Sequence, residues 1–339
     1  MTPRTRHLRW SRRRSRRNPS SRTKLCSRSR RDDPGGSFAL VDDSPNRSGL
    51  RRARENGAMG VRVLADDAVG VLVGAAVAKG ARRLQKAVRM VEKGEDDAIH
   101  QVRVSCRRLR SDLKLFRKLL AGEWAGALRA DLAGLALACG EARDLEVIAA
   151  LVKETVHSED DAEHVDYILS TLTAGLEQAA ARSAEVVLGD GTATLLRTLE
   201  TTALAPVLSP KAETPCGEAL PELLDGAVRL FAREADKLQP WTQDDDWHEV
   251  RLLAKRVRYA ANTCATVLGD EARATAVQAA RYQELLGQHQ DHCAAADALT
   301  ALVADAGPER AFTLGRLVER HRAARKPVRE EFLSLYHRS

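Results

Sequence analysis

The sequence of 339 residues has no apolar run approaching the roughly 20 residues that a membrane-spanning helix requires. Its longest apolar stretch, residues 68–78, is too short and too rich in glycine, so no membrane partner is expected. Aromatic residues make up only 4% of the chain, whereas Ala, Leu, Val, Arg and Glu dominate. Because long unbranched side chains lose little freedom on a helix, this composition favours helices over sheets.

Cysteine pairs are also missing. The six cysteines form no CxxC motif and have no regular spacing: Cys26, Cys106, Cys139, Cys216, Cys264 and Cys293. A disulfide framework is therefore not expected, which agrees with a reducing cytoplasm. The chain equally lacks a nucleophile motif, a glycine-rich phosphate loop and paired carboxylates in repeated positions. We expect neither an enzyme nor a cofactor.

The positive charge is unevenly distributed. Residues 1–55 hold 17 Lys+Arg against five Asp+Glu, whereas residues 56–339 hold 37 against 42, so the overall charge of +7 comes from the first segment. A segment this poor in apolar residues cannot bury enough surface to fold, and residues 1–58 are predicted to be a disordered arginine-rich tail. Translation from Met59, which would make the tail an artefact, is the favoured alternative. A targeting peptide is the third reading, but the secretory type needs an apolar core that is lacking.

Apolar residues recur every three or four positions almost throughout, which predicts an all-α protein. Helices are expected at 66–93, 97–121, 124–140, 142–157, 160–188, 191–204, 218–238, 246–268, 271–287, 289–306 and 309–337. The prolines and glycine of residues 206–217 indicate a linker. Asp96 and Asp97, like Asp244 and Asp245, are expected to cap helix N-termini, and Pro308 suits the start of the last helix.

The two halves of the chain resemble each other. A shift of 148 residues places "HQVRVSCRRLR" on "HEVRLLAKRVR", so that His100 meets His248 and Arg103 meets Arg251. A shift of 147 matches Gly140 with Gly287. A series of matches in constant order indicates an internal duplication, with each half forming roughly a four-helix bundle.

The repeated helix carries a narrow cationic stripe. Five residues lie within about 80° of one another around the helix axis: His100, Arg103, Arg107, Arg110 and Lys114. The second copy repeats the stripe with His248, Arg251, Lys255 and Arg258. Neighbouring cations repel one another, and no Asp or Glu lies on either stripe, so carboxylates elsewhere or an external polyanion must neutralise them. Arginine and lysine in such a row suit a chain of phosphates.

A solvated helix face is the competing interpretation, although its repetition in both halves argues for a function. Arg108 and Arg256 point away from the stripes and are expected either to bind or to pair with Asp144 and Asp291. A further row has the same spacing but only a partial repeat, and is expected to be a solvated face: Lys79, Arg82, Lys86 and Arg89.

At these residues the sequence resembles the CHAD family, the conserved histidine α-helical domain. The family's motif looks like H-x-x-R-x-x-x-[RK]-R-x-R, which is met at residues 100–110 and 248–258. A following G-x-x-R-D is met by residues 140–144, whereas the second copy has Gln290 in place of the arginine. The resemblance implies a domain over residues 62–338, with an N-terminal bundle at 62–205, the linker, and a C-terminal bundle at 218–338.

The family binds inorganic polyphosphate in a basic channel, often at polyphosphate granules in the cytoplasm. The resemblance implies these ligands here: His100, Arg103, Arg107, Arg108, Arg110, His248, Arg251, Lys255, Arg256 and Arg258. The stripe geometry adds Lys114. Some relatives carry a CYTH triphosphatase domain marked by ExExK, and no such strand occurs in this sequence. Non-catalytic polyphosphate binding is therefore expected.

Two other functions stay open. The first is a metal-binding or phosphohydrolase-accessory protein that uses paired histidines, with His289 and His292 near Cys293 as candidate ligands. Arginines beside His100 would repel a cation there. The second is unspecific nucleic-acid binding led by the tail, because the stripes lack aromatic residues on which bases could stack. No heptad seam is long enough to define an oligomeric state.

Overall fold

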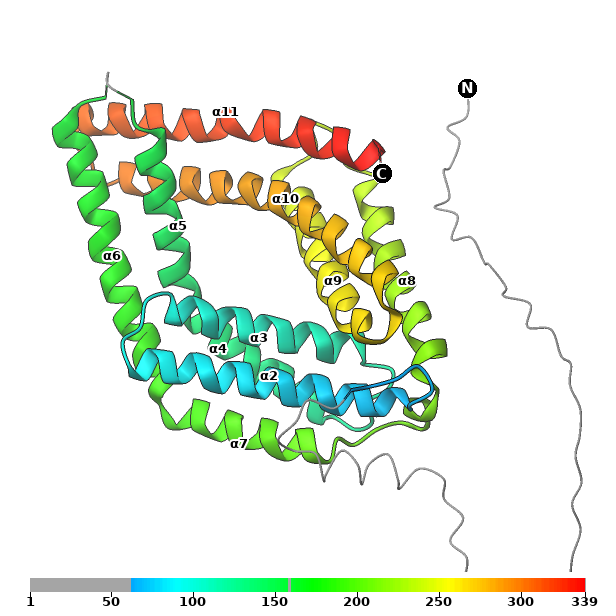
Figure 1. Cartoon of the computed structure of the whole chain (residues 1–339). Coiled ribbons are helices and arrows are strands. Elements are labelled where there is room, and N and C mark those ends of the chain that lie inside the picture. The colour runs from blue at the N-terminus through cyan, green and yellow to red at the C-terminus, as the bar shows by residue number, and fades with distance from the viewer. Residues whose placement is uncertain (1–61, 158–159, 339) are drawn as a thin grey trace, which may run out of the picture. The chain divides into compact units, whose positions relative to one another are not determined.

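The computed structural model describes residues 62–157 and 160–338. These residues form ten α-helices and no strand, so the all-α prediction is confirmed (Figure 1). No helix within them is long and apolar enough to span a membrane. The predicted tail, residues 1–58, lies outside the described residues.

The helices follow the apolar periodicity closely. Six precede the 206–217 segment: α2 (Val69–Glu92), α3 (Ala98–Leu115), α4 (Trp124–Ala138), α5 (Gly140–Thr155), α6 (Ala162–Leu188) and α7 (Asp190–Leu204). A 3₁₀ turn, Pro210–Glu213, separates these from the other four: α8 (Cys216–Ala235), α9 (Asp244–Leu268), α10 (Asp270–Val303) and α11 (Pro308–Arg338).

One helix boundary predicted from the apolar spacing is wrong. The helices expected at 271–287 and 289–306 are the single helix α10, which changes direction along its length in Figure 1. A glycine ends a helix when it takes up a left-handed conformation. Gly269, before α10, has a φ of 72°, whereas Gly287 is not among the residues with positive φ. Gly287 therefore continues the helix.

Two predicted N-caps are also wrong. Asp97 precedes α3, but its carboxylate accepts a hydrogen bond from Gln101 Nε2 at 2.6 Å and caps no backbone N–H. Asp244 is the first residue of α9, and its carboxylate accepts from Arg325 and Arg329 on α11. Pro308 does begin α11, as predicted.

The segment predicted to be a linker is held by backbone hydrogen bonds at several positions. Ala121 N donates to Val207 O at 3.1 Å, and Ser209 N donates to Leu119 O at 2.9 Å. Further along, Val69 N donates to Thr214 O at 2.9 Å. These backbone hydrogen bonds hold the crossing between the two parts of the chain against one end of the α2–α3 pair, where α2 begins and the chain leaves α3.

Three hydrophobic cores hold the helices together, and two of them mix helices from both sides of the 206–217 segment. One joins α8, α9, α10 and α11 with the start of α2. Another lies among α2, α3, α4, α6 and α7, and the third joins α5 and α6 to α10 and α11. The division into bundles at 62–205 and 218–338 stays a prediction, but the cores do not follow it.

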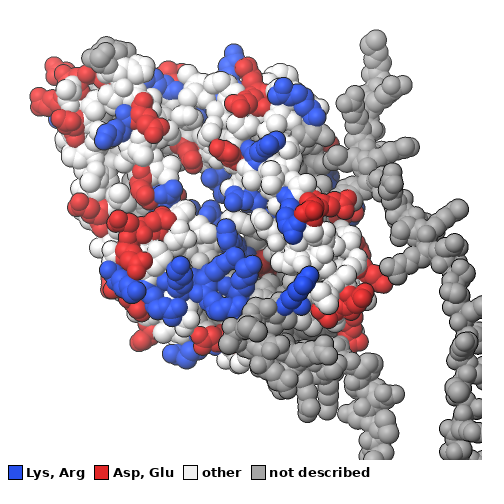
Figure 2. All heavy atoms as spheres, viewed as in Figure 1, with Lys and Arg blue, Asp and Glu red and all other residues white. Residues whose placement is uncertain are grey.

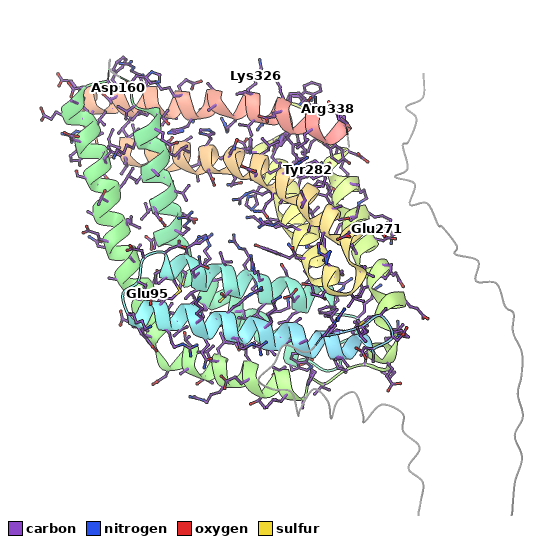
Figure 3. All side chains as sticks on the ribbon, viewed as in Figure 1. Glu95, Asp160, Glu271, Tyr282, Lys326 and Arg338 are labelled. Carbon is purple, nitrogen blue, oxygen red and sulfur yellow. The ribbon has the colours of Figure 1, made fainter. Side chains whose placement is uncertain are left out.

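Polar contacts reinforce the third core. Asp160 lies at the corner where the α5–α6 connection meets α11 (Figure 3). Its carboxylate pairs with Arg320 and, at 3.4 Å, with Arg316, while His157 N donates to Oδ2 at 2.8 Å. These contacts tie the first half of the chain to the last helix.

Candidate functional site

Helices α3 and α9 each bury one face and leave their charged face only partly covered. On α3, Val102, Cys106 and Leu109 are fully buried, and on α9 Val250 and Val257 are 4% exposed or less. These are the positions that the apolar pattern predicted to face the core. The buried faces fix the rotation of both helices, and with it the direction of the cationic stripes.

The stripes are not solvated faces. Of the eleven predicted binding residues, ten are half-buried and Lys255 is buried. The row on α2, namely Lys79, Arg82, Lys86 and Arg89, is by contrast exposed throughout, as expected of a solvated face. Partial burial makes an unneutralised charge costly, because less water surrounds it.

Cations from three helices meet in one place, which we name the central cation cluster. It consists of Arg103 and Arg107 on α3, Arg143 on α5, and Arg251 and Lys255 on α9. Burial lowers the pKa of Arg251, and the charges of Arg107 and Arg103 lower it further. Burial likewise lowers the pKa of Arg107, where Arg103 and Arg143 add to the effect. The stripes of the two sequence repeats thus converge.

Lys255 is the most deeply buried cation of the cluster. The residue is 7% exposed, and burial together with Arg251, Arg107 and Arg103 lowers its pKa to about 7. Neither Lys255 nor Arg107 has an ion-pair partner in the described part of the chain, and Arg107 Nε is buried without a hydrogen-bond acceptor. Two cations of the cluster are therefore left to be neutralised from outside.

Carboxylates compensate the other three cations from the outer side. Arg103 Nη1 donates to Asp144 Oδ1 at 2.8 Å, and Arg251 Nη2 lies 3.8 Å from Asp291 Oδ1. Arg143 pairs with an exposed glutamate, Glu146, at 2.8 Å. Asp144 and Asp291 are 59% and 41% exposed, so water screens these pairs and leaves them weak.

The glycines of the repeated motif support this arrangement. Arg103 Nη1 also donates to the carbonyl oxygen of Gly140 at 2.8 Å. A Cβ at Gly140 would lie 3.7 Å from that nitrogen, and one at Gly287 would lie 4.0 Å from Arg251 Nε. The first motif therefore contacts Arg103 and the second contacts Arg251. The alternative pairing of Arg108 and Arg256 with Asp144 and Asp291 was wrong, because these two arginines leave their helices on another side.

The two repeated histidines have different surroundings. Burial, followed by Arg143, lowers the pKa of His100, and its Nδ1 is buried without a hydrogen-bond partner. His248 Nδ1 lies 2.5 Å from Oε1 of Gln290, the residue that replaces arginine in the second motif. The first histidine therefore faces a cation and the second a neutral amide.

A second group of cations, which we name the lateral cation cluster, continues along α3. It consists of Arg110, Lys114, Arg117, Arg129 and Arg256. Burial lowers the pKa of Lys114, and Arg256, Arg129, Arg117 and Arg110 all lower it further. No ion pair joins these five residues to a carboxylate within the described ranges. Figure 2 shows Lys and Arg gathered in one connected area below the centre of this face, over α2 and α3.

Besides the two histidines, two predicted arginines lie outside both clusters. Arg108 lies over the ring of Tyr259, 5.9 Å from its centroid, and its charge acts on the half-buried Asp112. Arg258 Nη1 donates to Gln283 Oε1 at 3.1 Å. Conversely, the prediction of site residues omitted Arg143, Arg117 and Arg129. Arg143 stands in the G-x-x-R-D motif and was recoverable, whereas the other two carry no sequence signal.

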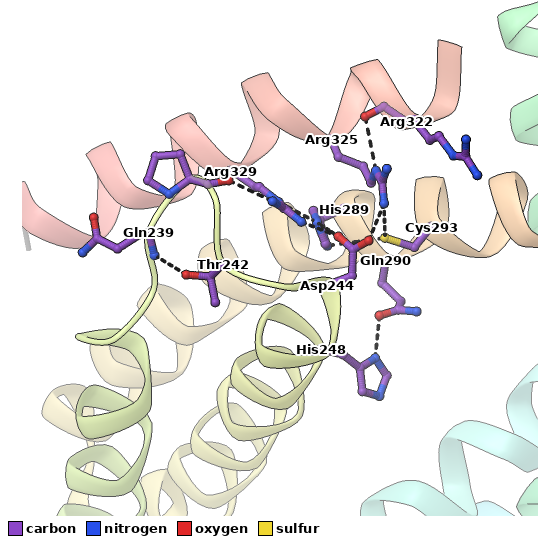
Figure 4. A network of polar contacts seen from close by, with 11 residues as sticks. Gln239, Thr242, Asp244, His248, His289, Gln290, Cys293, Arg322, Arg325 and Arg329 are labelled. Carbon is purple, nitrogen blue, oxygen red and sulfur yellow. Dashed lines mark hydrogen bonds and ion pairs between the residues drawn. The ribbon is translucent and has the colours of Figure 1, made fainter. Parts of the chain in front are cut away.

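The alternative metal site takes a different form from the one expected. Asp244, His289 and Cys293 have ligand atoms within 4.8 Å of one another (Figure 4). His292, which was expected to be a ligand, instead pairs with His321. Arg329 Nε donates to His289 Nε2 at 3.0 Å, and Asp244 accepts from Arg325 and Arg329. Two guanidinium groups thus occupy the carboxylate oxygens and the ring nitrogen that a metal ion would need as ligands.

Burial raises the pKa of Cys293 to about 11 and lowers that of His289 to about 4, the latter with help from Arg329. Arg325 and Arg329 also line an adjacent open cavity of about 400 Å³. This network holds α9, α10 and α11 together. The five described cysteines are all buried and free, in agreement with the expected lack of disulfides.

Comparison with known proteins identifies the family of the chain. The family model of the CHAD domain matches residues 75–300. The chain belongs to the CHAD domain family. The matched range of this CHAD protein contains α3, α5 and α9, which carry the whole central cation cluster.

Solved CHAD-like structures share the fold. "PptA from Streptomyces chartreusis" superposes with a TM-score of 0.67 at 21% identity, covering 79% of this chain and 99% of that one. The CHAD domain from the plant Ricinus communis superposes with a TM-score of 0.69 at 23% identity, covering 83% and 95%. At these identities the likeness concerns the fold.

Two sequence relatives come from Mycobacterium tuberculosis, "Uncharacterized protein MT2285" and "Uncharacterized protein Rv2226". Each is 29% identical to this CHAD protein over 264 residues, which is 72% of the chain. The chain spans about half the length of these relatives, 48% in both.

Proposed function

We propose that this CHAD protein binds inorganic polyphosphate without hydrolysing it, through the central and lateral cation clusters. The observation that carries the proposal is the convergence of half-buried cations from both sequence repeats. Arg107 and Lys255 come from different repeats, and the charge of one acts directly on the other. A polyanion that reaches both clusters removes this repulsion.

A chain of phosphates fits better than a single small anion. The central cluster keeps two cations without a carboxylate partner, and the lateral cluster keeps five. A long anion neutralises several of these charges in one molecule, so its second contact is already intramolecular. Arginine forks bind phosphate oxygens in pairs, and each neutralised phosphate releases counterions.

Nucleic acid is the weaker candidate. No aromatic residue belongs to either cluster, and Tyr259, beneath Arg108, is only 8% exposed. Without aromatic side chains on which to stack bases, nucleic acid would be held by its backbone alone. RNA of equal charge should therefore bind no better than polyphosphate, and without sequence preference.

The absence of hydrolysis is part of the proposal. Burial raises the pKa of the Cys106 thiol to about 12 and that of Cys139 to about 11, so neither supplies a thiolate near the clusters. The carboxylates near the central cluster are engaged with Arg103, Arg251 and Arg143. Polyphosphate incubated with the protein should release no phosphate.

The test is a titration of the full chain with polyphosphates of increasing length, with RNA of equal charge and free phosphate as controls. Arg107→Gln and Arg256→Gln remove one cation from each cluster and should each weaken binding of long chains by about tenfold. Arg197→Gln, on α7, is the matched control, because this side chain is exposed and, within the described residues, donates a hydrogen bond only to Thr194. Equal losses in all three variants, or none, would show that the clusters are not the site.

Attachment to polyphosphate granules in the cytoplasm follows from such binding. A fluorescent fusion of the full chain should gather at granules, and the double variant Arg107→Gln, Arg256→Gln should remain dispersed.

A further inference from the structure

We propose that Lys255 takes up a proton when the central cation cluster binds a phosphate chain, which makes the affinity of the site depend on pH. The inference rests on the proposed function and adds a regulatory property to the same site.

The position of Lys255 is unusual for a lysine. Lysines are rarely buried unless paired, and this one is 7% exposed without an ion-pair or hydrogen-bond partner in the described part of the protein. On its own helix it is four residues, one turn, after Arg251. Arg103 and Arg107 face it from α3, and Asp291 faces it from α10. Three cations thus surround the amine and one carboxylate opposes them.

The carboxylate does not offset the cations. Asp291 is itself partly buried, and burial raises its pKa, while its closest cationic partner is Arg251 at 3.8 Å. With a pKa of about 7, the amine of Lys255 is roughly half neutral at pH 7 and mostly neutral at pH 8. Arginine cannot respond in this way, because a guanidinium stays charged at any physiological pH.

A bound phosphate chain reverses the balance. Its negative charges lie next to the amine, so they favour the protonated form and raise the pKa of Lys255. Binding above pH 7 must then include the uptake of a proton, and affinity falls as pH rises. From a pKa of about 7, we expect roughly tenfold weaker binding at pH 8 than at pH 6.

His100 titrates in a lower pH range than Lys255. Burial and Arg143 hold its pKa below the usual value near 6.5, so it changes charge at lower pH. The Lys255 variants described below leave His100 in place, so the comparison with the wild type isolates the lysine.

The experiment is isothermal titration of the full chain with long-chain sodium polyphosphate at pH 8, in buffers that differ in protonation enthalpy. The dependence of the observed heat on that enthalpy measures the protons taken up. We expect close to one proton per site in the wild type. Lys255→Arg keeps a positive charge that does not titrate, so the uptake should disappear and the affinity at pH 8 should exceed that of the wild type.

Lys255→Met removes the amine and should also abolish the uptake, with weaker binding. It covers the case in which arginine does not fit the buried position, and circular dichroism checks that both variants are folded. Lys153→Arg, an exposed position on α5, is the matched control and should leave the uptake unchanged. Uptake that persists in both Lys255 variants would overturn the inference and leave polyphosphate binding intact. No binding by the wild type at any pH would overturn both.

Discussion

Arg103 on α3 donates from Nη1 to Oδ1 of Asp144 on α5 at 2.8 Å, and the same nitrogen donates to the carbonyl oxygen of Gly140. Its counterpart Arg251 approaches Asp291 only to 3.8 Å. The first arginine is therefore held in place at the entrance to α5, whereas the second is more loosely paired. The motif that looks like a chain of ligands in the sequence thus also contains the acids that orient them.

Replacing Asp144 by asparagine should strengthen polyanion binding. The variant removes a negative charge beside Arg103 but keeps an oxygen that can accept its hydrogen bond. Because the pair is exposed, unfolding free energy should fall by less than about 1 kcal/mol. Affinity for polyphosphate should rise severalfold at low ionic strength and approach the wild-type value in high salt. Weaker binding at low salt would mean that the carboxylate acts chiefly by orienting the arginine.

Salt should weaken binding in proportion to the phosphates that are neutralised. A plot of log affinity against log salt concentration is expected to be linear, with a slope that becomes shallower by about one for each phosphate-binding cation removed. Arg107→Gln and Arg256→Gln test this in the central and lateral clusters. Arg197→Gln should keep the wild-type slope.

The contact between α2 and α3 leaves no room for a side chain at Gly80. A Cβ there would lie 2.1 Å from Cδ2 of Leu109, which is fully buried and cannot move into solvent. Gly80→Ala should therefore lower the free energy of unfolding by about 1–3 kcal/mol and shift α3 with its cations. Denaturant unfolding measures the first effect and polyphosphate titration the second.

Gly226→Ala is the matched control in α8, because a Cβ at Gly226 meets nothing within 4 Å. Alanine is the better helix former, so this variant should be more stable by up to about 1 kcal/mol. A loss of stability similar to that of Gly80→Ala would show that space at Gly80 is not the cause.

Acid should loosen the packing of α10 against α11. His321 is fully buried, with Nδ1 3.1 Å from Nδ1 of His292, and burial followed by His292 lowers its pKa to about 4. The unfolded chain has the ordinary value near 6.5, so it binds more protons than the folded chain between these values. Stability is therefore complete above pH 6.5 and falls as pH drops toward 4.

His321→Asn places an amide near Nδ1 but does not titrate. Between pH 7 and pH 4.5, the wild type should lose about 2 kcal/mol more unfolding free energy than this variant. Urea denaturation at the two pH values gives the difference. His289, with a pKa lowered to about 4 by burial and Arg329, stays in both proteins and contributes equally. Identical losses would place the acid sensitivity elsewhere than at His321.

Local periodicity explains why much of the fold was predictable. The apolar positions of α3 and α9, such as Leu109 and Val250, recur at helical spacing, and that spacing alone assigns the buried face. The same reasoning failed for α10, because a glycine can continue a helix as well as end it. Asp244 resembled a cap for a related reason. A carboxylate before an apolar pattern suits capping, and only packing shows that two arginines of α11 claim it.

The helical class, the buried faces and the two cationic stripes were determined by the sequence alone, because each depends on residues within a few turns of one another. The tertiary structure decided how the stripes combine. It brought Lys255 close to Arg103 and Arg107 from a helix about 150 residues away, added Arg117 and Arg129, and assigned the motif aspartates to Arg103 and Arg251. Charge interactions and burial depend on distances through space, and those are set by the packing of whole helices.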